Sequence, residues 1–134
     1  MPFVLDASIA ACWCFHDEHD PRADAAWSRL DHERARVPIL WWFEIRNVIL
    51  QGERRGRVGE TNTTGFLGRL QRLPIDLVAL PDHGDVLALA RRHRLTFYDA
   101  AYLELAKREN VALATLDDAL AAAALTEGLE LVAG

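Results

Sequence analysis

The sequence predicts a single three-layer α/β domain, in which helices cover both faces of a central, mostly parallel sheet of about five short strands. Short apolar runs alternate with longer segments of helical periodicity along the chain, which is typical of parallel strands joined by helices. The 134 residues suffice for one buried core and are too few for two. No linker, repeat or low-complexity tract interrupts them, so we expect one domain over residues 1–134.

The first half of the chain opens with a strand pattern. Residues 2–5 form an apolar run that ends at Asp6, and helical patterns follow. Pro38 comes just before the longest of these patterns, where proline is tolerated because the first residues of a helix need no N–H partner. The predicted strands are 2–5 and 36–38, and the predicted helices are 7–15, 22–33, 40–55 and 60–73.

The second half continues the alternation. Pro74 and Pro81 bound an apolar run of strand type, and Gly128 precedes the last such run. The predicted strands are 75–80, 111–115 and 129–133. The predicted helices are 82–93, 117–125 and one that begins at Thr96 or Phe97 and ends at Lys107.

Composition excludes several classes of protein. Half of the residues are apolar and about a quarter are charged, as in ordinary globular proteins. No apolar run approaches the roughly 20 residues that span a bilayer, and the N-terminus lacks a signal-peptide pattern. We therefore expect a cytoplasmic protein without a membrane segment. Cys12 and Cys14 are neither a CxxC motif nor a plausible disulfide, and we interpret them as core side chains.

Two aspartates follow predicted strands. Asp6 comes directly after the first strand, and Asp117 follows the strand over 111–115 by one residue. Ligands of parallel α/β folds bind beyond the carboxyl ends of the strands. A helix N-cap is the alternative interpretation of each aspartate, because Asp caps well and a helical pattern follows both.

Glu44 lies on an apolar stripe of the predicted helix over 40–55. Trp41, Glu44 and Ile45 follow the i, i+3, i+4 spacing of one buried face. A carboxylate that faces the interior is costly unless it is paired or binds a cation. A salt bridge to Arg46 or Arg91 is the alternative to cation binding.

Asp99 shows the same anomaly. It shares a helix face with Tyr102, Leu103 and Ala106, so its carboxylate is expected to point towards the sheet. The alternative is a favourable interaction with the helix dipole, since Asp99 lies in the first helical turn.

Four acids in four separate segments form a stronger pattern together than singly. Crowded carboxylates raise one another's pKa values, and a hard cation such as Mg²⁺ or Mn²⁺ removes that cost. The chain has no His/Cys set at zinc spacing and no Walker, GxGxxG or GxSxG motif. The run from His16 to Asp20 is a competing cluster, but contiguous loop residues cannot all converge on one ion, so we interpret it as a solvated connector.

Four motifs carry a resemblance to a known family. They are VLDAS near the N-terminus, WWFEIRNVI around Glu44, FYDAAYLELA around Asp99 and LATLDDALAAAA near the C-terminus. In this order they resemble the motifs of PIN-domain proteins, specifically the VapC-type toxins of bacterial toxin–antitoxin pairs. The resemblance implies a PIN-like fold with a central parallel sheet, Mg²⁺- or Mn²⁺-dependent endonucleolytic cleavage of RNA, and a cognate antitoxin as partner.

The resemblance also implies roles for individual residues. By motif position the primary metal-binding acids are Asp6 and Asp99, the acids that complete the site are Glu44 and Asp117, and the supporting small polar residues are Ser8 and Thr115. Asp118 is the alternative fourth acid, and we favour Asp117 because it holds the motif position. With no histidine nucleophile or base in view, we expect water rather than the RNA 2′-hydroxyl to attack.

Charge is unevenly distributed along the chain. Residues 44–72 contain six arginines and three glutamates, a net +3 within a chain of net charge −5. A basic surface beside an acidic centre suits RNA binding, although a solvated helix face is the alternative. The residues that we expect to steer RNA are Arg46, Arg54, Arg55 and Arg57.

The helix over 40–55 also has more apolar surface than one buried stripe needs, from Trp41, Trp42, Phe43 and Leu50. This excess predicts a homodimer or an antitoxin groove, with packing against the helix over 60–73 as the alternative.

Two rival functions are open. A phosphatase needs a second acid two residues after its nucleophile, where this chain has Ser8, and a catalytically silent interaction domain would be expected to have lost one of the acids.

Overall fold

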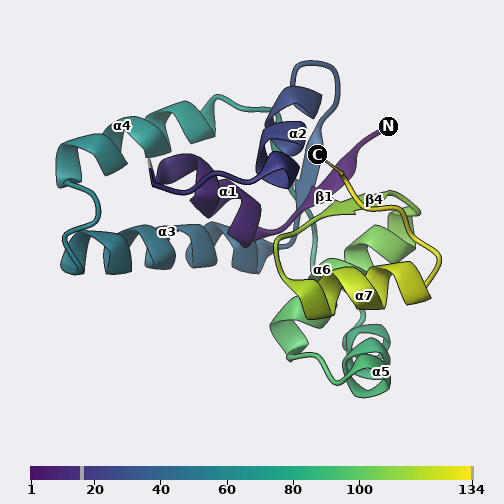
Figure 1. The fold of residues 1–134 in the computed structure, drawn as a ribbon. Coiled ribbons are helices and arrows are strands. Elements are labelled where there is room, and N and C mark those ends of the chain that lie inside the picture. The colour runs from purple at the N-terminus through teal and green to yellow at the C-terminus, as the bar shows by residue number, and fades with distance from the viewer. Residues whose placement is uncertain (16, 134) are drawn as a thin grey trace.

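The computed structural model describes residues 1–15 and 17–133 (Figure 1). Its strands are β1 (Phe3–Leu5), β2 (Ala35–Val37), β3 (Ile75–Leu77) and β4 (Ala112–Ala114). Its helices are α1 (Ala7–Cys14), α2 (Pro21–Arg29), α3 (Ile39–Arg54), α4 (Glu60–Gln71), α5 (His83–His93), α6 (Phe97–Glu109) and α7 (Asp118–Thr126). Strands alternate with helices along the chain, as the sequence predicts.

The four strands form one parallel sheet in the order β3-β2-β1-β4. In the pair of β1 with the edge strand β4, Leu5 lies opposite Ala114. The predicted fifth strand over 129–133 is reduced to a single bridge between Leu131 and Leu113. It makes only two ladder hydrogen bonds, both to Leu113, so the sheet has four strands rather than about five. The predicted three-layer α/β class is confirmed.

Apart from α2, the helices form two groups around the sheet. Helices α1, α3 and α4 run side by side at the left of Figure 1, and α5, α6 and α7 gather at the lower right. The most extensive contacts between helices, those of α1 with α3 and of α5 with α6, lie one within each group. None of the helices in residues 1–15 and 17–133 is long and apolar enough to cross a bilayer.

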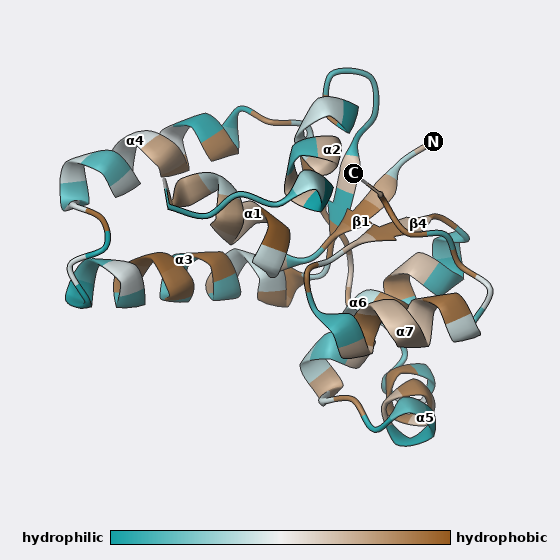
Figure 2. Cartoon of the chain, in the orientation of Figure 1, coloured by the Kyte–Doolittle hydropathy of each residue, from teal (hydrophilic) through white to brown (hydrophobic). Residues whose placement is uncertain are grey.

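Helix α6 is the central helix of the fold. Every residue from Ala100 to Ala106 is buried, and Figure 2 shows β1 and β4, which α6 contacts, mostly in hydrophobic colours. The one buried charge in this run, Glu104, pairs with Arg108 at 3.0 Å. The predicted apolar face of this helix is therefore part of a segment, residues 100–106, that is buried on all sides.

Glu127 joins the three helices of the right-hand group. Its carboxylate lies 2.6 Å from Lys107 Nζ, 2.6 Å from His93 Nε2 and 2.8 Å from Arg92. The hydrogen bonds from Lys107, His93 and Arg92 lower the pKa of Glu127 to about 2. Since Glu127 ends α7, Lys107 belongs to α6 and the other two to α5, the cluster fixes these helices relative to one another.

Several element boundaries differ from the predicted ones. The helix over 22–33 already ends at Arg29, and the strand over 75–80 ends at Leu77. The second strand ends at Val37 because Pro38, which has no N–H to donate to a ladder, begins the turn into α3. Cys12 and Cys14 are buried free thiols, which confirms their interpretation as core residues. The connector over 16–20 begins at His16, which lies outside the described residues.

Candidate active site

Asp6 and Asp117 lie at the same edge of the sheet. Asp6 directly follows β1, and Asp117 precedes α7 just beyond β4. Because β1 and β4 are adjacent and parallel, their carboxyl ends meet, as expected for a ligand site of this fold. Glu44 of α3 and Asp99 of α6 approach the same edge from two helices.

The Asp6 carboxylate is buried, with 6% of the residue exposed. One of its oxygens, Oδ2, accepts hydrogen bonds of 2.7 Å from the hydroxyls of both Ser8 and Thr115. These hydroxyls accept in turn from the backbone N–H groups of Leu116 and Asp117, each at 3.0 Å. Asp6 occupies the N-cap position of α1, but its side chain makes no capping hydrogen bond there, so the two hydroxyls rather than a cap hold its carboxylate.

Glu44 is half-buried and accepts a hydrogen bond of 2.5 Å from the hydroxyl of Tyr102. The alternative of a salt bridge to Arg46 or Arg91 is not found in the described part of the chain. Arg46 instead donates to the carbonyl oxygen of Trp42 at 2.9 Å and lies 3.9 Å from the centre of that indole ring.

Asp99 lies half-buried in the first turn of α6, where its N–H donates to the Thr96 hydroxyl at 3.1 Å. Asp117 does act as an N-cap, since its Oδ1 accepts from the N–H of Leu120 at 2.9 Å. Its capping role and its place in the acidic cluster are therefore compatible.

The electrostatics show that the acids are neighbours. Burial raises the pKa of Asp6, and Asp117 raises it further. The pKa of Glu44 is raised by burial and then by Asp6 and Asp99. Burial, Asp117 and Asp6 raise the pKa of Asp99. We call Asp6, Glu44, Asp99 and Asp117 the acidic cluster.

Asp118 is the alternative fourth acid of the sequence, and its side chain is fully exposed. Its only ion pair among residues 1–15 and 17–133 is a loose one, at 3.9 Å from the guanidinium of Arg22. Asp118 does not contribute to the raised pKa values of Asp6, Glu44 or Asp99, whereas Asp117 contributes to two of them.

The acidic cluster fits a hard divalent cation better than a soft one. All of its donors are carboxylate oxygens, which Mg²⁺ and Mn²⁺ prefer. Among the described residues, no three His, Cys, Asp or Glu side chains lie close enough together to hold a metal ion. Carboxylates that repel one another are expected to remain apart until a cation is present.

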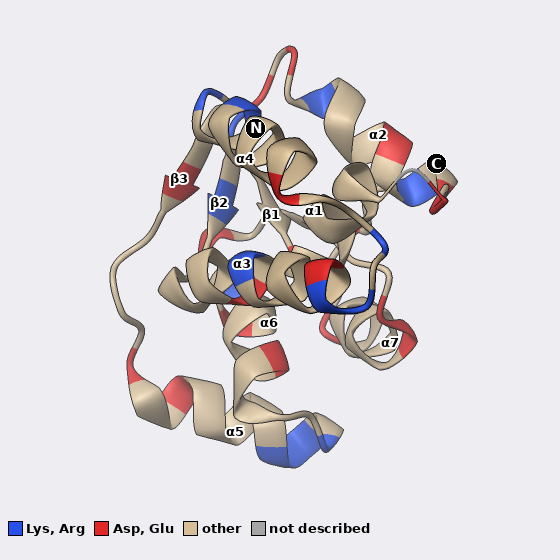
Figure 3. Ribbon diagram, turned by 90° about the vertical axis from the view of Figure 1, so that its left-hand side faces the viewer, with Lys and Arg blue, Asp and Glu red and all other residues tan. Residues whose placement is uncertain are grey.

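The four arginines predicted to steer RNA have different surroundings. Arg57 pairs with Asp17 and Glu18, each at 3.0 Å, so much of its charge is already compensated. Arg54 and Arg55 are exposed and form no ion pair with another described residue. They belong to the basic segment at the far end of α3, which Figure 3 shows in blue.

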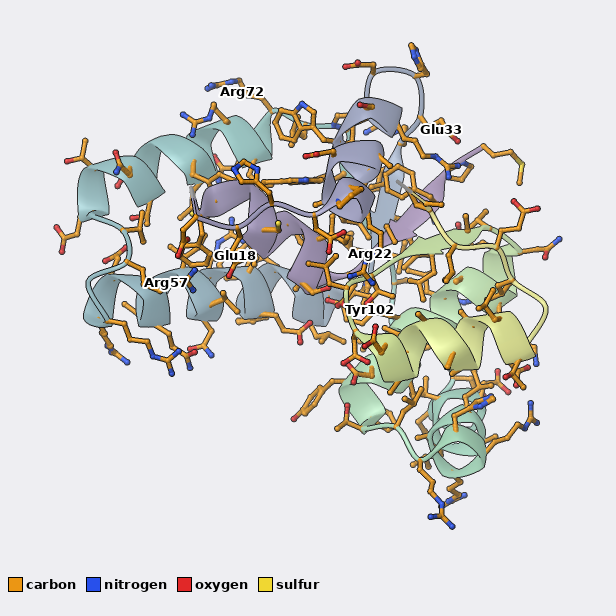
Figure 4. All side chains as sticks on the ribbon, viewed as in Figure 1. Glu18, Arg22, Glu33, Arg57, Arg72 and Tyr102 are labelled. Atoms are coloured by element: carbon orange, nitrogen blue, oxygen red, sulfur yellow. The ribbon has the colours of Figure 1, made fainter. Side chains whose placement is uncertain are left out.

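Sequence reasoning missed two residues near the site. Tyr102 was assigned to a buried face, but nothing in the pattern indicated that its hydroxyl reaches Glu44. Arg22 is held by Asp20 through two hydrogen bonds, of 2.9 and 3.0 Å, beside Asp118. Figure 4 shows Arg22 and Tyr102 where the two helix groups meet.

Comparison with known proteins agrees with this fold. The family model of the PIN domain matches residues 3–126, and the chain belongs to the PIN-domain family. It is 32% identical over 127 residues to Ribonuclease VapC3 of Pyrobaculum aerophilum, a match that covers 90% of this chain and 93% of that protein. The resemblance to VapC-type PIN-domain proteins is thereby confirmed.

Two solved structures share the fold. The crystal structure of PAE2754 from Pyrobaculum aerophilum has a TM-score of 0.73 at 23% identity and covers 92% of this chain and 84% of its own. The structure of VapC20 from Mycobacterium tuberculosis, described as a toxin that cleaves the sarcin–ricin loop, has a TM-score of 0.64 at 14% identity. That match covers 90% of this chain and 94% of VapC20. At these identities the two matches show the fold alone.

Proposed function

We propose that the protein is an endoribonuclease that depends on Mg²⁺ or Mn²⁺ and is the toxin of a toxin–antitoxin pair. The observation that carries this proposal is the placement of four carboxylates from four elements close enough to influence one another, in which Asp6, Glu44 and Asp99 have raised pKa values. The names of Ribonuclease VapC3 and of the VapC20 toxin support RNA as the substrate.

Each acid has a role in this proposal. Asp6 and Asp99 would hold the cation, with Asp117 and Glu44 completing the site. A divalent cation bound there supplies an activated water and stabilises negative charge on the scissile phosphate. The two hydroxyls on Asp6 Oδ2 orient its carboxylate and leave Oδ1 for the cation. Attack by water gives products with a 5′-phosphate and a 3′-hydroxyl.

RNA would approach the acidic cluster along α3. Arg54 and Arg55 are the strongest candidates for phosphate contacts, because they are exposed and lack a carboxylate partner in the described structure. Arg46 and Arg57 are weaker candidates, since one is stacked on Trp42 and the other is paired with two acids. Such contacts release counterions and make RNA binding sensitive to salt.

We further propose a homodimer and a cognate antitoxin as protein partners. Trp41 is buried in the core, but Phe43 is 63% exposed, and Trp42 and Leu50 are exposed as well. Phe43 also lines an apolar groove with Leu80 and Tyr98, which α3 and α6 border. Sedimentation of Phe43→Glu beside wild type tests the dimer, because a charge in a buried interface dissociates it. Equal sedimentation of both proteins contradicts a dimer through Phe43.

A cleavage assay tests the proposed activity. Purified protein is incubated with RNA and Mg²⁺ or Mn²⁺, with and without EDTA, beside Asp6→Asn and Asp99→Asn. We expect cleavage by wild type only, and only with the metal. Asp118→Asn is the matched control, since Asp118 is exposed beside the cluster and should leave cleavage unchanged. Equal cleavage by wild type and the two cluster variants would defeat the proposed site.

A further inference from the structure

Tyr102 joins two helices of the site through a single hydrogen bond. The residue has no exposed surface, so its hydroxyl needs a partner inside the protein. That partner is Glu44, whose Oε1 accepts the bond at 2.5 Å across 58 residues of sequence. The bond connects the middle of α6 with α3, two elements that each supply one acid of the cluster.

The direction of this hydrogen bond is fixed. A tyrosine hydroxyl carries a proton, and an ionised carboxylate has only acceptor atoms. Tyr102 therefore donates this hydrogen bond and Glu44 accepts it. A charged acceptor makes such a bond stronger than one between neutral groups.

The bond occupies only one oxygen of Glu44. In the part of the chain that the structure describes, Oε2 has no hydrogen-bond partner. Asp99 lies three residues before Tyr102 on the same helix, so one rigid element both presents Asp99 and holds Glu44. This arrangement sets the distance between the two acids through α6 rather than through α3 alone.

We propose that Tyr102 is a positioning residue of the metal site, whose hydroxyl holds Glu44 by Oε1 and leaves Oε2 for the cation. This role rests on the proposed function, and Tyr102 acts through Glu44 without touching cation or RNA. Outer partners of metal ligands typically contribute about tenfold or more to metal affinity. We expect a loss of about tenfold when the hydroxyl is removed.

Metal binding to the RNA-free protein provides the test. Mn²⁺ affinity is measured from the electron paramagnetic resonance signal of free Mn²⁺ for wild type, Tyr102→Phe and Tyr98→Phe. Tyr98 is the matched control, because it is the other tyrosine of the chain, lies on the same helix and is 62% exposed. We expect weaker binding by Tyr102→Phe and unchanged binding by Tyr98→Phe, with the melting temperature of each variant establishing that it is folded.

A double-mutant cycle separates positioning from a general packing effect. Tyr102→Phe is also introduced into Glu44→Gln, which keeps an acceptor for the hydroxyl but removes the charge. We expect the loss of Mn²⁺ affinity only when Glu44 is present. An equal loss in both backgrounds, or no loss in either, overturns the role of Tyr102 while the metal site itself remains. Absence of Mn²⁺ binding by wild type overturns the metal site and the role of Tyr102 together.

Discussion

The Asp6 carboxylate accepts a hydrogen bond of 2.7 Å from the hydroxyl of Thr115, which lies 109 residues later in the chain. The two residues follow the carboxyl ends of β1 and β4, where the backbone N–H of Asp6 also donates to the carbonyl oxygen of Ala114 at 2.9 Å. The site and the pairing of the first and last strands are therefore one structural unit.

Removal of the Thr115 hydroxyl should destabilise this unit. Thr115→Val keeps the shape of the side chain but takes one of two hydroxyl donors from the buried Asp6 carboxylate. We expect a loss of about 1–3 kcal/mol in the free energy of unfolding, measured by urea denaturation at pH 7. Thr64→Val, at an exposed position, is the control. A change no larger than that of the control would contradict the role of this bond.

Neutralising Asp99 should stabilise the metal-free protein. The pKa of Asp99 is raised in the fold above the ordinary value of 3.8, so the unfolded chain loses this proton at a lower pH than the folded protein. The free energy of unfolding therefore falls as the pH rises from the ordinary pKa to the raised pKa. We expect Asp99→Asn to melt a few degrees above wild type at pH 7 in EDTA. The gain should vanish below the ordinary pKa, where both states are protonated. A lower melting temperature than wild type at pH 7 would argue against mutual repulsion.

The Glu127 cluster should show the opposite dependence on pH. The pKa of Glu127 is lowered from 4.5 to about 2 in the folded protein. The stabilisation of the fold by the charged Glu127 is therefore complete above pH 4.5 and is lost as the pH falls from 4.5 towards 2. We expect Glu127→Gln to lose about 1–2 kcal/mol at pH 7. Urea denaturation at pH 7 and pH 3 checks this, and a loss that does not shrink at pH 3 would disprove the assignment.

Arg54 and Arg55 should set the salt dependence of RNA binding. The paired substitution Arg54→Gln and Arg55→Gln is made in Asp99→Asn, so that RNA is bound and not cleaved. Each lost phosphate contact should reduce the slope of log affinity against log salt by about 0.7. Arg57→Gln is the comparison, because Arg57 is already paired with Asp17 and Glu18. An unchanged slope in the paired variant would exclude these two residues from the RNA-binding surface.

Periodicity and position were sufficient to predict most of the fold, and together with the PIN-domain motifs they indicated the members of the acidic cluster. Glu44 could be singled out because an acid on an apolar stripe needs a partner or a cation. The alternation of strands and helices predicted the parallel sheet because each crossover helix spans the distance between parallel strands. Asp6 was ambiguous, since an aspartate before a helix has the same pattern whether it caps the helix or not.

Contacts between distant segments could not be predicted from local patterns. The bond from Tyr102 to Glu44 depends on how α6 packs on α3, and the pattern marked Tyr102 only as buried. The end of β3 at Leu77 was missed for the same reason, because the apolar run continues to Leu80 while the pairing with β2 stops. The pairing of Arg57 with Asp17 and Glu18 equally depends on tertiary structure.

The strands of this sheet are only three residues long, and this makes the site a check on correct folding. If β4 slipped by one residue along β1, its side chains would turn to the opposite faces of the sheet, and Leu113 would lose its place in the core. Thr115 would also no longer lie next to Asp6, and the carboxylate would be buried without one of its donors. A chain with slipped strands would thus keep its helices but be inactive. Nuclease activity would therefore report the fraction of correctly paired molecules, which a measurement of helix content would not.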